Sequence, residues 1–164
     1  MITGVRLFGA GRLILSLLQG VMEMTIQAIL LPLFVQVTLT FVMLGLTGYS
    51  RRASILRGDT KVKDIALGEP NWPEHVTKFG NSYHNQFQLP VLFYVVVILA
   101  YVLRKADLPF VILSWLFVAT RLVHAYIHTT SNHVRRRFNV FASGFAVLVA
   151  MWIIFAVRIL IVPQ

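Results

Sequence analysis

Residues 24–49 read MTIQAILLPLFVQVTLTFVMLGLTGY, a stretch that contains no charged side chain. A helix of about 20 consecutive apolar residues crosses a bilayer, so this stretch predicts a transmembrane helix. Of all 164 residues, 57% are hydrophobic and 13% are charged, whereas a soluble domain carries roughly 25% charged residues. We therefore expect an all-α integral membrane protein that crosses the bilayer several times.

Three further apolar segments follow the first. The fully apolar part of the second, residues 89–103, is too short to cross alone, so this helix must begin near residue 76 and bring polar side chains into the membrane. Pro90 predicts a kink in this span, because proline lacks a backbone donor. The predicted spans are about 24–49, 76–103, 108–130 and 135–162, and together they form a four-helix membrane domain at 21–164.

Residues 1–20 are expected to form a leader or an interfacial helix. A secretory signal peptide is not favoured, because no small-x-small cleavage site follows the short apolar run at 13–18. The chain has no cysteine, which excludes disulfides, thiolate metal sites and a cysteine nucleophile. Its net charge of +9 lies at the ends of the apolar spans. This placement indicates contacts with lipid headgroups and argues against nucleic acid as a partner.

The basic residues gather in the connection between the first and second spans and in the turn between the third and fourth. Cytoplasmic loops of membrane proteins carry an excess of lysine and arginine. Both connections are therefore expected in the cytoplasm and both termini on the other side, which in a bacterium means a multi-pass protein of the inner membrane. The residues behind this count are Arg51, Arg52, Arg57, Lys61, Lys63, Lys78, Arg135, Arg136 and Arg137.

A polar stripe runs along the start of the second span. Its members are spaced i, i+3, i+4 and i+7, so one helical face carries all of them. Unsatisfied amides are costly in hydrocarbon, so the stripe must face another helix, another subunit or a wet cavity. Interhelical hydrogen bonding and ligand binding both remain open as its role. The stripe consists of Asn81, His84, Asn85 and Gln88.

A second polar face lies on the third span, where Arg121, His124 and His128 are spaced i, i+3 and i+7. Arg121 lies roughly 10 Å inward of His128 at 1.5 Å per residue. It cannot lose its proton, and no predicted span offers a carboxylate. Arg121 therefore needs either an anionic ligand or the carbonyls and amides of neighbouring helices. The histidines lack a glutamate or cysteine at metal-ligand spacing, so we expect no metal.

The order of these motifs resembles the MAPEG family, the membrane-associated proteins of eicosanoid and glutathione metabolism, and most of all its uncharacterised bacterial branch. The likeness rests on Asn85-Gln86-Phe87-Gln88-Leu89-Pro90, on Arg121-x-x-His124-x-x-x-His128 and on Arg137-Phe138, within residues 24–160. It implies a left-handed four-helix bundle assembled as a homotrimer. It also implies that glutathione binds between subunits, near the cytoplasmic side.

The resemblance also suggests roles for single residues. Arg51 looks like the family's first arginine, which contacts a glutathione carboxylate. Arg121 matches the family's arginine of the third helix. Arg137 is the best match for the arginine that stabilises the glutathione thiolate, although Arg135 fits the spacing of some members. A guanidinium beside sulfur lowers the pKa of a thiol, so this role is physically sensible.

Two positions depart from the family pattern. Asn85 keeps the family's asparagine, but Gln88 stands where members carry a glutamate that would accept the ammonium of glutathione. His128 stands where eicosanoid enzymes have a tyrosine that helps to hold the tripeptide. Both departures fit a family member with another ligand or without catalysis.

We therefore expect a glutathione transferase or peroxidase that acts on an apolar electrophile arriving from the bilayer. One alternative is a non-catalytic lipid-binding or scaffold protein of the same fold, and another is a small transporter with Arg121 and the histidines lining its pathway. Arg137 is the expected catalytic residue, since at 100° per residue it shares a face with Gly144 and Leu148. The expected ligand-binding residues are Arg51, Asn81, His84, Asn85, Gln88, Arg121, His124 and His128.

Overall fold

The computed structural model describes residues 24–68 and 71–161, and every regular element in these ranges is helical. Four spans are long and apolar enough to cross a membrane: α2, the series α3–η2–α4 taken as one, α5 and α6. The predicted all-α protein with four transmembrane helices is thereby confirmed, while the prediction for residues 1–20 lies outside the described ranges. The elements are α2 (Ile26–Leu56), η1 (Val62–Asp64), α3 (Glu74–His84), η2 (Asn85–Phe87), α4 (Leu89–Val102), α5 (Leu108–Thr129) and α6 (Val134–Leu160).

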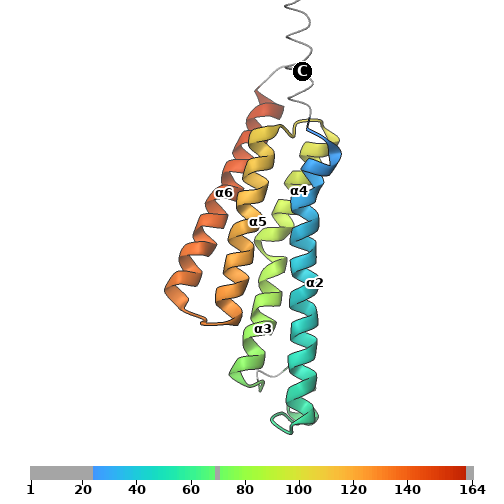
Figure 1. Cartoon of the computed structure of the whole chain (residues 1–164), viewed down its shortest axis with the longest axis vertical. Coiled ribbons are helices and arrows are strands. Elements are labelled where there is room, and N and C mark those ends of the chain that lie inside the picture. The colour runs from blue at the N-terminus through green and yellow to red at the C-terminus, as the bar shows by residue number, and fades with distance from the viewer. Residues whose placement is uncertain (1–23, 69–70, 162–164) are drawn as a thin grey trace, which may run out of the picture.

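The spans run side by side as a bundle (Figure 1). Helix α2 packs against α3, α4 and α5, whereas α6 packs against α5 and α4. The α2–α3 connection and the α5–α6 turn lie at the same end of the bundle, and the α4–α5 turn lies at the other (Figure 1). At the first end, α2 and α3 extend beyond the α5–α6 turn. We refer to this as the basic end, because it carries the arginines and lysines counted above.

Helix boundaries follow from local capping. The Thr25 hydroxyl accepts from the Ala28 amide at 3.2 Å at the start of α2, and Asp107 accepts from the Phe110 amide at 3.1 Å at the start of α5. Helix α2 continues to Leu56, past the expected end at residue 49, and stops before Gly58, whose φ of 79° suits glycine. Asp107 also receives the guanidinium of Arg158, at 2.6 and 2.8 Å, which ties α6 to the start of α5.

The second span is broken where a kink was expected. Helix α3 ends at His84, a 3₁₀ turn follows, and Gln88 has φ −98° and ψ −105° before α4 begins with Pro90 in its first turn. Gln86 lies within this break and points into the bundle, as Ser82 does one turn earlier, and its side-chain oxygen accepts from Gln36 at 2.9 Å. Both of these glutamines are buried, whereas Gln88 is exposed. The amide that enters the core is thus Gln86, which the predicted stripe did not include.

The apolar core lies away from the basic end and joins α4, α5 and α6 with the start of α2, which contributes Ile29. The rings of Phe93 and Phe117 stack with their centroids 4.5 Å apart, and neither side chain is exposed. Val96, Val118 and Met151 are also fully buried in this cluster. The core fixes the relative positions of the spans, so the polar side chains at the basic end stand on a rigid support.

Candidate functional site

Arg121 reaches across from α5 to the backbone of α6. Its Nη2 donates to the carbonyls of Val140 and Phe141 at 3.2 and 3.3 Å. The guanidinium carbon lies 5.2 Å from the ring centroid of Phe141 and 5.5 Å from that of Phe117, at cation–π distance. Arg121 is 3% exposed. Of the two partners considered for this arginine, helix carbonyls are present, and they belong to α6.

Gly144 makes this crossing possible. It is buried on α6, one helical turn beyond Val140, at the place where the Arg121 guanidinium crosses that helix. A Cβ at Gly144 would lie 2.9 Å from Cζ of Arg121, closer than real Cβ atoms approach another heavy atom, and it would also clash with Oγ1 of Thr120. The position must therefore remain a glycine for Arg121 to reach the α6 carbonyls.

A small cavity of about 220 Å³ opens at the basic end, beside the contact of Arg121 with α6. Arg137 is half-buried there, whereas Arg135 and Arg136 are exposed. The Arg137 Nη1 donates to the side-chain oxygen of Asn132. None of the ion pairs within residues 24–68 and 71–161 involves Arg137, so no carboxylate in these ranges neutralises its positive charge. The cavity is lined by Asn85, His124, Val134, Arg137, Phe138 and Phe141.

Asn85 connects the polar stripe to the polar face of α5. Its side-chain nitrogen lies 3.2 Å from Nδ1 of His128. The His124 ring stands 5.7 Å from the His128 ring and 5.8 Å from that of Phe141, by centroids. The two histidines are buried, although His124 still lines the cavity. The structure therefore brings Asn85, His124, His128 and Arg137 together.

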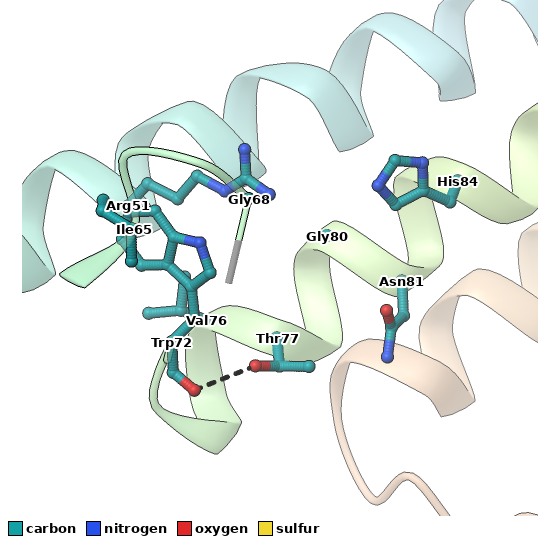
Figure 2. A pocket seen from close by; sticks show the side chains of 9 residues that line it. All are labelled: Arg51, Ile65, Gly68, Trp72, Val76, Thr77, Gly80, Asn81 and His84. Carbon is teal, nitrogen blue, oxygen red and sulfur yellow. Dashed lines mark hydrogen bonds between the residues drawn. The ribbon is translucent and has the colours of Figure 1, made fainter. Parts of the chain in front are cut away.

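Three of the other predicted residues gather in a second cavity of about 500 Å³, where α2, the following loop and α3 meet (Figure 2). Arg51, Asn81 and His84 all line it. The Arg51 guanidinium carbon lies 5.1 Å from the ring centroid of Trp72, which the loop brings back over α2. Its Nη2 would lie 3.6 Å from a Cβ built on Gly80, so the side chain runs close over the α3 backbone.

The two cavities lie one after the other along α3. Asn81 and His84 belong to the larger cavity, and Asn85 belongs to the smaller one. Gln88 lines neither cavity and is exposed in the break after η2. The basic end thus offers two cavities, each lined by an arginine.

A model of the MAPEG family matches residues 29–157. The chain belongs to the MAPEG family. This match confirms the resemblance found in the motifs and covers all four spans, while membership of the bacterial branch stays an expectation. Searches of curated proteins and of solved structures returned no match.

This MAPEG chain also contains an apolar groove of about 360 Å³ between α4 and α6. Leu89 and Leu92 form one wall, one and two turns beyond Asn85, and Phe145 continues the α6 face one turn beyond Phe141. The groove therefore lies farther along the same face of α6 as the Arg137 cavity, toward the middle of the membrane. Its remaining lining residues are Leu148, Val149, Trp152, Ile153 and Ala156.

Two residues of this MAPEG site escaped prediction from the sequence. Asn132 and Trp72 each contact one of the arginines, but both lie in connections without periodicity. The one available sequence signal for Asn132 was an asparagine in a short turn, because asparagine tolerates the left-handed backbone that this turn has. As for metal, the described ranges contain no group of three or more histidine, aspartate or glutamate side chains arranged to hold an ion.

Proposed function

We propose that this MAPEG protein is a glutathione transferase or peroxidase that acts on an apolar electrophile arriving from the bilayer. One observation carries the proposal: the guanidinium of Arg137, which forms no ion pair among the described residues, lies in a cavity, and an apolar groove follows along the same face of α6. A charged cavity and an apolar groove on one helix face provide the two environments that a thiolate and a lipophilic substrate require.

The charged cavity fits the thiol end of glutathione. Its volume of about 220 Å³ is below the roughly 300–1,000 Å³ of typical ligand sites, so the rest of the tripeptide would extend along α3. Gly80, over which Arg51 lies, and Asn85 are separated by about 7.5 Å of helix axis at 1.5 Å per residue. Arg51 could therefore bind a carboxylate while Arg137 faces the sulfur.

Glutathione supplies a thiolate that attacks an electrophilic carbon and forms a C–S bond while the leaving group departs. Arg137 favours the thiolate, because a nearby guanidinium stabilises the negative charge in a partly dry site. The thiol proton passes to water at the open basic end. The α4–α6 groove holds the apolar part of the electrophile and excludes water around it.

The same proposal includes a homotrimer. Asn81, His84 and Gln88 remain exposed on the surface of the second span in a single chain. Lipid is a poor environment for amides and imidazoles, because unsatisfied polar groups there cost several kcal/mol. A neighbouring copy would cover these side chains and complete a ligand site between subunits, as the family resemblance implies.

The first experiment is calorimetry of the detergent-purified assembly with glutathione. Binding in the micromolar to low millimolar range supports the proposal, and the absence of binding contradicts it. The second compares Val149→Trp with Val157→Trp in thiol conjugation of a long-chain electrophile. Both valines are exposed on α6, at 38% and 42%, but only Val149 lines the groove. We expect Val149→Trp to slow conjugation without changing glutathione affinity, and Val157→Trp to change neither.

A non-catalytic lipid-binding protein is the second candidate. Gln88 in place of glutamate favours it, and so does His128, which is paired with Asn85 inside the protein. Under this alternative the α4–α6 groove holds a bilayer lipid, and thiol turnover is absent. Co-purified lipid that Val149→Trp displaces, together with no heat on adding glutathione, would establish this alternative over the enzyme.

A further inference from the structure

The turn between α5 and α6 places an asparagine against the cavity arginine. Asn132 accepts from Nη1 of Arg137 through its side-chain oxygen. We propose that Asn132 is a positioning residue, which fixes the Arg137 guanidinium at the mouth of the cavity and leaves its charge available. This inference rests on the proposed function, because it assumes that Arg137 meets the anionic end of the ligand.

The backbone of the turn determines where Asn132 points. Its φ is 48°, in the left-handed region that asparagine adopts more readily than most residues. Its amide donates to the carbonyl of Ile127 at 2.7 Å, and that of Thr130 donates to Tyr126 at 3.1 Å. These bonds terminate α5. The backbone of the turn, and not the contact with Arg137, therefore sets the direction of the Asn132 side chain. The asparagine is therefore a fixed acceptor for a long, flexible side chain.

The chemistry of the acceptor matters as much as its position. A guanidinium has five N–H donors, so a single bond to Asn132 leaves the other donors free for a ligand. The amide oxygen is neutral, so the positive charge of Arg137 is not cancelled as it would be beside a carboxylate. Arg158 shows the contrast, because both of its terminal nitrogens bind the carboxylate of Asp107.

The test uses the full-length chain in detergent, with glutathione as the probe. Asn132→Gly removes the acceptor but keeps the left-handed turn, which glycine tolerates. We expect glutathione affinity to fall about three- to tenfold, less than the roughly ten- to hundredfold that the loss of a hydrogen bond of a charged group can cost, because Arg137 keeps its charge and loses only its orientation. Asn132→Asp keeps the acceptor and adds a negative charge. We expect it to weaken glutathione more than tenfold while leaving the melting temperature the same or higher.

The matched control is Asn139→Asp, which adds the same charge on the exposed surface of α6, two residues beyond Arg137. It should change glutathione affinity less than twofold. Equal losses in Asn132→Asp and Asn139→Asp would mean that only the surface potential matters. That outcome would overturn the positioning role of Asn132.

A second readout does not depend on glutathione. The side-chain Nε–Hε resonance of Arg137, assigned by its loss in Arg137→Lys, reports how rigidly the guanidinium is held. In Asn132→Gly we expect its hydrogen exchange to accelerate about tenfold or more. If the wild-type protein does not bind glutathione, the proposed function fails, yet this resonance still tests the contact. An unchanged Arg137 resonance in Asn132→Gly would overturn the inference whatever the ligand is.

Discussion

Substituting alanine for Gly144 should destabilise the protein through Arg121. The new Cβ would lie 2.9 Å from Cζ of Arg121, so the guanidinium must leave the carbonyls of Val140 and Phe141. Each of these charge-assisted hydrogen bonds is worth about 1.5–3 kcal/mol. Alanine in place of glycine stabilises a helix by about 1 kcal/mol, which offsets part of this loss. We therefore expect the free energy of unfolding to fall by about 2–5 kcal/mol, measured by thermal or denaturant unfolding in detergent.

The matched control is Gly45→Ala on α2, where a new Cβ would have no atom within 4 Å. It should leave stability unchanged or raise it by up to about 1 kcal/mol. In a background with both Arg121→Met and Thr120→Ala, Gly144→Ala should also become nearly neutral, because neither the guanidinium nor the Thr120 hydroxyl then needs the space. Wild-type stability in Gly144→Ala, or the same loss in this background as in the wild type, would refute the argument.

Three further predictions concern the site, the topology and the buried glutamine pair. Arg137→Ala should reduce glutathione affinity or turnover about ten- to a hundredfold at matched protein content, whereas Arg136→Ala should change either quantity little. Equal losses would mean that these arginines act only through their charge at the membrane surface. A protease site in the α2–α3 connection should be cut from the cytoplasm and a C-terminal tag should be protected, and the reverse accessibility would contradict the orientation. Gln36→Leu should cost about 1–3 kcal/mol, because Gln86 loses its partner, and adding Gln86→Leu should recover part of the loss; a double variant less stable than the single one would contradict the pairing.

The fold was predictable because a bilayer imposes lengths that can be counted. Uncharged stretches longer than a membrane crossing leave little choice of element, and capping residues such as Asp107 mark where helices begin. The end of α2 was not predictable in this way. Hydropathy marks where a helix leaves the hydrocarbon, but the hydrogen-bonded helix continues through Arg51 to Leu56, until Gly58 turns the chain.

The break in the second span shows a different limit. Pro90 predicted an interruption of the helix, and one is present. The stripe assigned by 100° steps named Asn81, His84 and Gln88, and all three are exposed, whereas Ser82 and Gln86 are buried on another side of this span. Spacing identified a polar face, but it could not show which face meets α2, where Gln36, fifty positions away, pairs with Gln86.

Periodicity was more useful within α6, which is unbroken. It placed Arg137 on the side of Gly144 and Leu148, and those two residues are buried in the structure while Arg135 and Arg136 are exposed. It could not indicate which side chain would hold Arg137, because Asn132 lies in an irregular turn. Trp72 escaped prediction for the same reason, since a loop brings it to Arg51.

The arginines differ in whether their partners cancel their positive charge. Arg158 meets the carboxylate of Asp107, so its positive charge is neutralised at the end of the bundle opposite the cavities. Arg121 meets only neutral carbonyls, but it is buried against α6 and Phe141 stands over its guanidinium. Arg51 and Arg137 meet neutral groups as well, an indole and an amide, and both line a cavity. A neutral partner orients a guanidinium without cancelling its charge, so the capacity to bind an anion remains at the basic end, where His84 lines one cavity and its neighbour Asn85 lines the other.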